Sequence, residues 1–161
     1  MKNLVFGEND NNSAIEESEC LDLKAQIRDV LIKEITDNLL HKFIDLEVIT
    51  LEEEHSVIRI KCSERTNNPY GFAHGGVLLT LADAAAGTTA CMCGKYVTTV
   101  NANLNFLLPA KDTEYIYCES RMLRRGTHLA VYEVKIKDDR ARLLDSGEFT
   151  FFITSNKVLT F

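Results

Sequence analysis

The chain has 161 residues, of which 45% are hydrophobic and 26% charged, a composition typical of one soluble globular domain. Its formal net charge of -6 argues against nonspecific nucleic-acid binding as its main activity. The charge is uneven, because residues 1–20 carry one Lys and five acids, whereas residues 121–142 carry seven Lys or Arg and three acids. A basic stretch of this kind can still meet an anionic ligand.

The five cysteines are odd in number and include no C-x-x-C pair. Such spacing favours neither a disulfide framework nor a zinc site, and reduced thiols fit the cytosol. The first ten residues hold no secretory apolar run, and residues 76–94, which lack Lys and Arg, have Asp83 near their middle. We therefore expect a cytoplasmic protein without a metal, and neither a membrane nor a nucleic acid as its partner.

Residues 1–20 hold too little apolar surface to offset the entropy of ordering, so the sequence predicts a mobile acidic tail. In residues 21–40 apolar side chains recur at three- and four-residue spacing, which predicts an amphipathic helix of about five turns. We expect this helix to cover an apolar surface of the same chain, with docking of a partner as the alternative. Residues 41–161 form the main domain.

In the main domain the apolar residues first alternate with a period of two, then follow helical spacing, and then alternate again with a period of two. A long apolar helix is expected at about residues 73–91, after a polar loop at residues 64–70. Period-two patterns predict strands at residues 44–48, 56–62, 99–108, 115–123, 129–137 and 148–154, with turns at Arg125 and Gly126, at Asp138 and Asp139, and around Ser146 and Gly147. One helix packed on an antiparallel sheet is an α+β arrangement.

Asp83 is the only charged residue between Thr66 and Gly94. A carboxylate in the middle of an apolar helix is costly to bury unless it is hydrogen-bonded, paired or faces a cavity. Two interpretations remain open. Asp83 either bonds a neighbouring backbone group in a purely structural role, or it is a general base or nucleophile.

The segment before the helix, residues 68–77, reads N-P-Y-G-F-A-H-G-G-V and puts His74, Gly75 and Gly76 at the helix start. Unpaired N–H groups and the positive end of the helix dipole favour negative charge there. An N–H aimed at a carbonyl oxygen would form an oxyanion hole. The alternatives are a tight glycine turn alone and a histidine satisfied by the backbone.

Asp83 lies nine residues after His74, which is ~13 Å along a helix at 1.5 Å per residue. One chain therefore cannot easily bring Asp83 to a carbonyl held at Gly75. Two antiparallel copies of the helix about a two-fold axis can, because the start of one then lies beside the middle of the other. The spacing predicts a homodimer with two composite sites.

These residues resemble a known family, the hotdog-fold acyl-CoA thioesterases of the phenylacetate-degradation (PaaI) type, which are related to the 4-hydroxybenzoyl-CoA thioesterases. The resemblance covers about residues 40–155. It rests on an ordered set: Asn68, Gly71, His74, Gly75 and Gly76, then Leu81, Ala82 and Asp83, then Thr98 to Asn101, Pro109 and Ala110, and finally Arg125 and Gly126. It implies a long central helix wrapped by a curved antiparallel sheet, in homodimers that pair into homotetramers.

The resemblance also implies roles for five residues. The Gly75 N–H would polarise the thioester carbonyl, His74 would shape the turn and contact the substrate, and Asn68 would orient the thioester or the attacking water. Asp83 of the opposite protomer would activate water or attack directly, assisted by the Thr99 hydroxyl. Hydrolysis of this kind needs no metal or redox cofactor, because coenzyme A is part of the substrate.

Substrate contacts are expected from residues at the helix start, in an apolar slot and on the basic stretch, namely Gly76, Phe72, Leu79, Arg124, Arg125, Gly126 and His128. The family often carries a basic residue and then a small hydroxyl residue after the Arg-Gly pair, whereas Thr127 and His128 stand there in this chain. Each cation has an alternative as a solvated charge at a strand end.

The sequence therefore predicts a thioesterase that hydrolyses an aryl- or short- to medium-chain acyl-CoA. A non-catalytic acyl-CoA sensor on the same fold is the alternative. It is disfavoured because such sensors carry a preceding DNA-binding helix-turn-helix, whereas the leading segment here is acidic. A hotdog dehydratase is disfavoured too, because its characteristic His-containing motif is absent.

Overall fold

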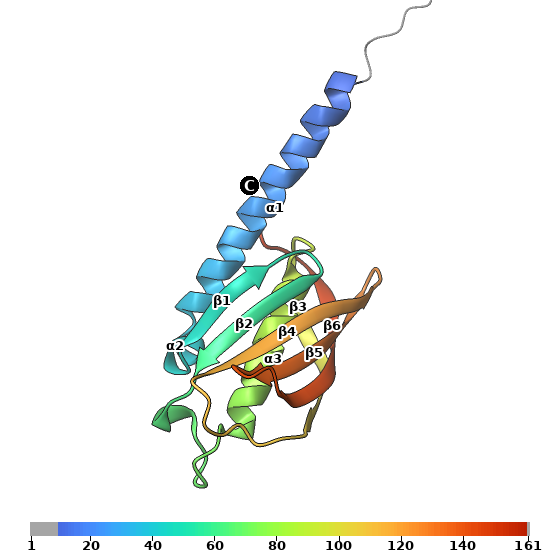
Figure 1. The fold of residues 1–161 in the computed structure, drawn as a ribbon. Helices are drawn as coiled ribbons and strands as arrows, with labels where there is room; N and C mark the ends of the chain where they lie inside the picture. Colours follow the sequence, from blue (N-terminus) through green and yellow to red (C-terminus); the bar gives the residue numbers. More distant parts are fainter. Residues whose placement is uncertain (1–9, 161) are drawn as a thin grey trace, which may run out of the picture.

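A six-stranded antiparallel sheet curves around one long helix in the computed structural model, which describes residues 10–160 (Figure 1). The strand order is β1-β2-β4-β5-β6-β3. The strands are β1 Leu46–Leu51, β2 His55–Lys61, β3 Lys95–Phe106, β4 Tyr115–Arg125, β5 Leu129–Asp138 and β6 Leu143–Lys157. The helices are α1 Asp10–Asp37, α2 Leu39–Phe43 and α3 Gly75–Cys91, with a short 3-10 turn at Glu64–Thr66. This arrangement confirms the predicted α+β hotdog architecture.

The central helix α3 packs into the concave face of the sheet through small side chains. Leu81, Ala82, Ala85 and Ala86 are fully buried against the inward-facing residues of the strands. Alanine allows the sheet to approach the helix backbone closely, and Ala also has the highest helix propensity. The helix begins two residues after its predicted start, because His74 is its N-cap. The long apolar run is therefore a core helix.

The strand β3 lies at one edge of the sheet and is exposed on both faces. Residues 98–103 are all exposed, and Val100 is 60% exposed. An edge strand of a finished sheet is normally short, charged or covered. This edge is long and uncharged through its middle, so it is a suitable surface for pairing with another strand.

The predicted turn around Ser146 and Gly147 is wrong, because β6 runs through both residues. Gly147 serves a different purpose, the close approach of β6 to β3. A Cβ atom at Gly147 would overlap the Asn103 carbonyl oxygen and lie 2.9 Å from the Cα of Leu104. Glycine here marks a close backbone contact inside a sheet.

The helix α1 starts at Asp10, earlier than the predicted start at residue 21. Residues 10–20, which the sequence assigns to the tail, are thus helical. Residues 1–9 of that tail lie outside the described part. The helix ends at Asp37, because the Asn38 side chain accepts the Leu40 N–H at 2.9 Å and begins α2.

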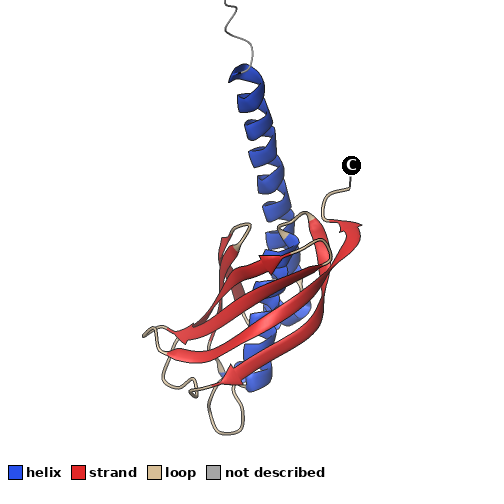
Figure 2. Cartoon of the chain, turned by 90° about the vertical axis from the view of Figure 1, so that its right-hand side faces the viewer, coloured by secondary structure: helices blue, strands red, loops and turns tan. Residues whose placement is uncertain are grey.

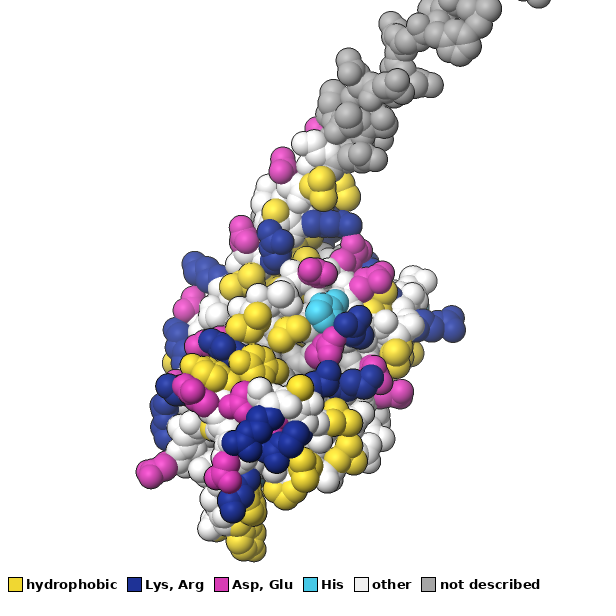
Figure 3. Space-filling view, viewed as in Figure 1, with side chains coloured by type: hydrophobic (Ala, Val, Ile, Leu, Met, Phe, Trp, Pro, Cys, Tyr) yellow, Lys and Arg dark blue, Asp and Glu magenta, His cyan; other side chains and the backbone are white. Residues whose placement is uncertain are grey.

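The two halves of α1 have different surroundings. Its N-terminal half projects past the sheet, whereas its C-terminal half lies along the body (Figure 2). Ile27 and Leu31 are buried there with Cys91, Met92 and Val158, so this half covers an apolar surface of its own chain, as expected. None of the helices within residues 10–160 is long and apolar enough to cross a membrane. Figure 3 shows basic and acidic side chains interspersed over one face of the body.

Candidate active site

The start of α3 leaves one backbone donor free. The N-cap His74 has an extended backbone (φ -68, ψ 131), and its Nδ1 accepts the Gly76 N–H at 2.9 Å. The N–H groups of Val77 and Leu78 both donate to the His74 carbonyl oxygen. Within residues 10–160 the Gly75 N–H has no acceptor. The histidine is thus satisfied by the backbone, and the free donor is the N–H that the sequence singles out.

Asn68 closes the loop before α3 and keeps its amide NH₂ available. Its Oδ1 accepts the N–H groups of Tyr70 at 2.9 Å and Phe72 at 3.1 Å. Its own N–H donates to the Phe72 carbonyl at 2.7 Å. The Nδ2 group has no acceptor among the described residues, and Asn68 lines the same cavity as Gly75.

That cavity, the Gly75 cavity, has a volume of about 270 Å³. Most of its walls are apolar, and its polar groups are few, as in many small-molecule sites. The lining residues are Asn68, Phe72, Ala73, Gly75, Leu78, Phe106, Leu107, Leu108, Pro109, Ala110 and Asp145.

Asp83 lies elsewhere in the same chain. Its Oδ1 accepts a 2.8 Å hydrogen bond from the Thr99 hydroxyl on β3. Both residues line two further cavities, of about 440 and 380 Å³, beside the middle of α3, and Leu79 lines the smaller one. Asp83 is eight residues after Gly75, or ~12 Å along α3. The structure therefore brings together Asn68, Phe72 and Gly75 on one side and Leu79, Asp83 and Thr99 on the other.

Six residues of the expected site line none of these three cavities: His74 and Gly76 at the start of α3, and Arg124, Arg125, Gly126 and His128 of the β4–β5 hairpin. His74 and Gly76 are exposed, and the ring of His74 is held by the Gly76 N–H. A Cβ atom at Gly76 would lie 3.1 Å from Nδ1 of His74. Glycine at residue 76 thus makes room for the histidine cap.

The β4–β5 hairpin carries the expected cations at the Asp83 end of the sheet. Leu129 pairs with Phe152, and Phe152 pairs with Thr98 beside Thr99. The His128 ring stacks on Phe152 with centroids 6.4 Å apart. Arg124 and the Gly126 and Thr127 positions are exposed.

Arg125 differs from its neighbours, because it is already paired. Its Nη2 lies 3.0 Å from Oε1 of Glu53, which also contacts Lys24 at 2.6 Å. The hydrogen bonds from Lys24 and Arg125 hold the pKa of Glu53 below its ordinary value. Arg125 thus ties the hairpin to α1 and the β1–β2 turn.

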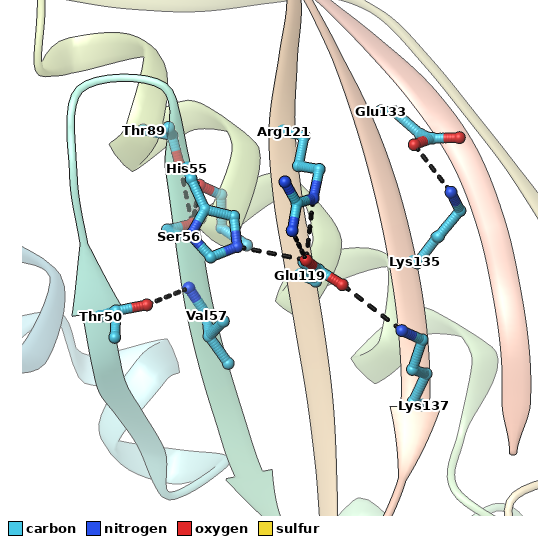
Figure 4. A network of polar contacts seen from close by, with 11 residues as sticks. Thr50, His55, Ser56, Val57, Thr89, Glu119, Arg121, Glu133, Lys135 and Lys137 are labelled. Carbon is cyan, nitrogen blue, oxygen red and sulfur yellow. Dashed lines mark hydrogen bonds and ion pairs between the residues drawn. The ribbon is translucent and has the colours of Figure 1, made fainter. Parts of the chain in front are cut away.

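Arg121 and Lys137, from the same basic stretch, are also paired. Both contact Glu119 on the outer face of the sheet, at 2.6 and 3.4 Å, and His55 lies 3.3 Å from the same carboxylate (Figure 4). These cations hold the pKa of Glu119 below its ordinary value, with the Arg121 hydrogen bond as the largest cause. Arg124 and His128 are therefore the basic side chains of the hairpin that no carboxylate within residues 10–160 pairs.

Comparison with known proteins agrees with this geometry. Residues 70–144 match the model of the thioesterase superfamily. Mouse acyl-coenzyme A thioesterase 13 is 31% identical over 112 residues, which are 65% of this chain and 79% of the mouse protein. The chain belongs to the thioesterase superfamily. The prediction of an enzyme that hydrolyses thioesters is confirmed at this level.

Two solved structures resemble this thioesterase in fold. The PaaI protein of E. coli, from the phenylacetic acid degradation operon, has a TM-score of 0.76 at 18% identity and covers 83% of this chain and 96% of its own. A hypothetical thioesterase of Streptococcus pneumoniae, solved with coenzyme A, has a TM-score of 0.72 at 25% identity and covers 78% of this chain and 98% of its own. The hotdog fold is thus shared with both.

Sequence reasoning missed Asp145 in this thioesterase. The residue lies on β6 and lines the Gly75 cavity, although it is only 1% exposed. Desolvation raises the pKa of its carboxyl to about 6. Placing a turn at Ser146 and Gly147 hid it. A strand with period two through residues 145, 147 and 149 would have turned Asp145 inward with Phe149.

His41 was missed as well, and no motif points to it. The residue belongs to α2, and its Nδ1 donates to the Ile35 carbonyl at 2.8 Å. It lines both cavities that Asp83 and Thr99 line. The end of the N-terminal helical segment therefore borders the Asp83 side of the site. Among the described residues no three His, Cys, Asp or Glu side chains are placed to hold a metal ion.

Proposed function

We propose that this protein hydrolyses acyl-CoA thioesters and that it is of the phenylacetate-degradation type, acting on an aryl- or short- to medium-chain acyl group. The free Gly75 N–H at the start of α3, beside an apolar cavity, carries the proposal. Asp83, held by its hydrogen bond from Thr99, supplies the carboxylate for the reaction. Mouse acyl-coenzyme A thioesterase 13 and the coenzyme A-bound Streptococcus pneumoniae thioesterase support this substrate class.

In the proposed reaction the thioester carbonyl oxygen accepts the Gly75 N–H, and the Asn68 amide orients the ester or the water. Asp83 of the partner subunit takes a proton from water as the new C–O bond forms. The oxyanion is stabilised at Gly75, the C–S bond breaks, and the departing thiolate takes the proton from Asp83. Direct attack by the Asp83 carboxylate, giving an anhydride that water then hydrolyses, remains the second route.

The reaction requires two chains, because Gly75 and Asp83 line different cavities of one protomer. We propose a homodimer in which the exposed β3 edges pair and two composite sites form, and a homotetramer made of two such dimers. The exposed residues 98–103 and the large apolar side chains on β3 and just after it, Val100, Phe106, Leu107 and Leu108, support this interface. The proposed location is the cytoplasm.

We propose that residues 41–161 are the thioesterase domain and that the helical segment before it closes the Asp83 side. For the coenzyme A phosphates, Arg124 and His128 on the β4–β5 hairpin are the available basic side chains, and Gly126 is exposed beside them. Arg125, held by Glu53, would position the hairpin. His74 and Gly76 would shape the start of α3.

A panel of coenzyme A esters tests the proposal. Aryl, short-chain and medium-chain esters are incubated with the purified protein, and free thiol is measured against an uncatalysed control. The proposal expects thiol release from some esters and much less with Asp83→Asn. Binding of coenzyme A esters without thiol release from any ester would favour the non-catalytic sensor and overturn the hydrolase.

A further inference from the structure

Asp145 carries a buried carboxyl with nothing to satisfy it. The residue is 1% exposed, and neither Oδ1 nor Oδ2 has a hydrogen-bond partner within residues 10–160. Burying an unpaired carboxyl is costly, and buried polar groups in folded proteins are almost always hydrogen-bonded. Asp138, the other inward carboxyl at this end of the sheet, shows the usual solution, an ion pair with Arg142 at 2.6 Å. Asp145 therefore needs a separate explanation.

The place of this carboxyl indicates what it could bind. Asp145 lines the Gly75 cavity, where a thioester carbonyl would be held, and the cavity is otherwise apolar apart from Asn68 and Gly75. Desolvation is the one cause that raises the pKa of Asp145, so no cation of the described chain compensates its charge. An unpaired acceptor in an apolar cavity is complementary to a ligand that carries a hydrogen-bond donor.

We propose that Asp145 is a specificity-determining residue that binds a hydrogen-bond donor, a hydroxyl or an ammonium group, at the far end of the acyl group. The inference rests on the proposed thioester hydrolysis and names the substrate class of the same site. A methyl group at that end would leave the carboxyl unpaired and desolvated. Sites built around a buried polar group reject ligands that lack the matching group.

Phe106 is a close neighbour of this carboxyl. It pairs directly with Asp145 across β3 and β6, so the two side chains lie on the same face of the sheet as close neighbours. Phe106 lines the same cavity. In the proposed complex the acyl end lies beside this ring and reaches the Asp145 carboxyl.

Matched coenzyme A esters test the inference, because a methyl, a hydroxyl and an ammonium group can stand at the same position. One set is butanoyl, 3-hydroxypropanoyl and 3-aminopropanoyl-CoA, and a longer set is heptanoyl, 6-hydroxyhexanoyl and 6-aminohexanoyl-CoA. We measure kcat/KM for the wild type, Asp145→Val and Asp145→Asn. Glu148→Gln, an exposed position on the outer face of the same strand, is the control.

The inference expects the wild type and Glu148→Gln to prefer a donor-bearing ester over the methyl ester of one set by about tenfold or more, the range of a hydrogen bond to a charged group. Asp145→Val should reverse that preference. Asp145→Asn should keep the hydroxyl preference and lose the ammonium preference, and it carries the test if the valine variant fails to fold. The inference is overturned if Asp145→Val ranks the esters as the wild type does, or if Asp145→Asn keeps a wild-type preference for the ammonium ester. Either result leaves the proposed thioester hydrolysis intact. Thiol release from no ester of the broad panel overturns the proposed function and this inference with it.

Discussion

The Thr99 hydroxyl donates a 2.8 Å hydrogen bond to Oδ1 of Asp83, which joins the edge strand β3 to the middle of α3. This contact fixes the orientation of the one carboxylate on the central helix. It also leaves Oδ2 of Asp83 without a partner within the described chain, facing cavities that a second subunit or a substrate can fill.

Removal of the charge at Asp83 should abolish most of the activity. Asp83→Asn keeps the shape and the contact with Thr99 but cannot accept a proton, so kcat should fall about a hundredfold or more. Thr99→Val should cost up to about tenfold, the worth of one hydrogen bond, and Thr99→Ser should retain most of the rate. Steady-state thiol release measures each variant, and an Asp83→Asn enzyme with wild-type kcat would contradict the role.

The Gly75 N–H can be removed without disturbing the helix. Gly75 is the first residue of α3, where proline is well tolerated, and the extended backbone of His74 suits a residue before proline. Gly75→Pro should lower kcat by about 10²- to 10³-fold through loss of an oxyanion donor. Gly75→Ala keeps the N–H and is the matched control, because both add a Cβ atom 3.4 Å from the Phe106 ring. Equal rates for the two variants would exclude the N–H as donor.

The fold was largely predictable, because each element leaves a local pattern in the sequence. The uncharged run around Asp83 and the glycines at Gly75 and Gly76 predicted the central helix and its start. The separation of Gly75 from Asp83 along α3 also followed from sequence, since eight residues of helix have a fixed length. These features depend on local backbone geometry, which residues close together in the sequence determine.

Asp145 and His41 were not predictable in this way, because their surroundings come from distant segments. Asp145 comes to line the same cavity as Gly75 only when β6 pairs with β3. Gly147 is typical of a turn in the local sequence, and its close contact with the Asn103 carbonyl also arises only from that pairing. His41 reaches the Asp83 side only because α1 packs across the body. Tertiary contacts of this kind leave no periodic pattern.

The buried Asp145 should make stability depend on pH in a known direction. Its pKa is raised to about 6 in the folded protein, so the native state holds the proton more tightly than the unfolded chain does. Its favourable contribution is therefore full below about pH 4 and lost as the pH rises to about 6. Asp145→Asn should gain about 2 to 3 kcal/mol in unfolding free energy, relative to wild type, between pH 4 and pH 7.

Urea unfolding of both proteins across this range measures that difference. Asp138, Asp139, Glu53 and Glu119 have lowered pKa values and shift stability in the opposite direction. They are common to both proteins, so they cancel in the comparison. A difference that does not change with pH would contradict the buried, unpaired carboxyl.

The C-terminal half of α1 should stabilise the domain, whereas the projecting half should not. Leu31 is 4% exposed among Ile27, Cys91 and Val158, so Leu31→Ala should cost about 2 to 5 kcal/mol of unfolding free energy. Leu21, at 67% exposed, is the control, and Leu21→Ala should change stability by about 0.5 kcal/mol or less. Chemical denaturation distinguishes the two, and equal effects would show that α1 does not pack as described.

Mixed dimers of Gly75→Pro and Asp83→Asn test most directly whether each site is shared between two chains. Each variant alone should be nearly inactive. In a mixed dimer one composite site carries both changes and the other carries neither, so an equal mixture refolded together should recover roughly a quarter of wild-type activity. Mixing without subunit exchange is the control. Recovery to that level is the predicted result, and a refolded mixture no more active than its parents would contradict the shared site.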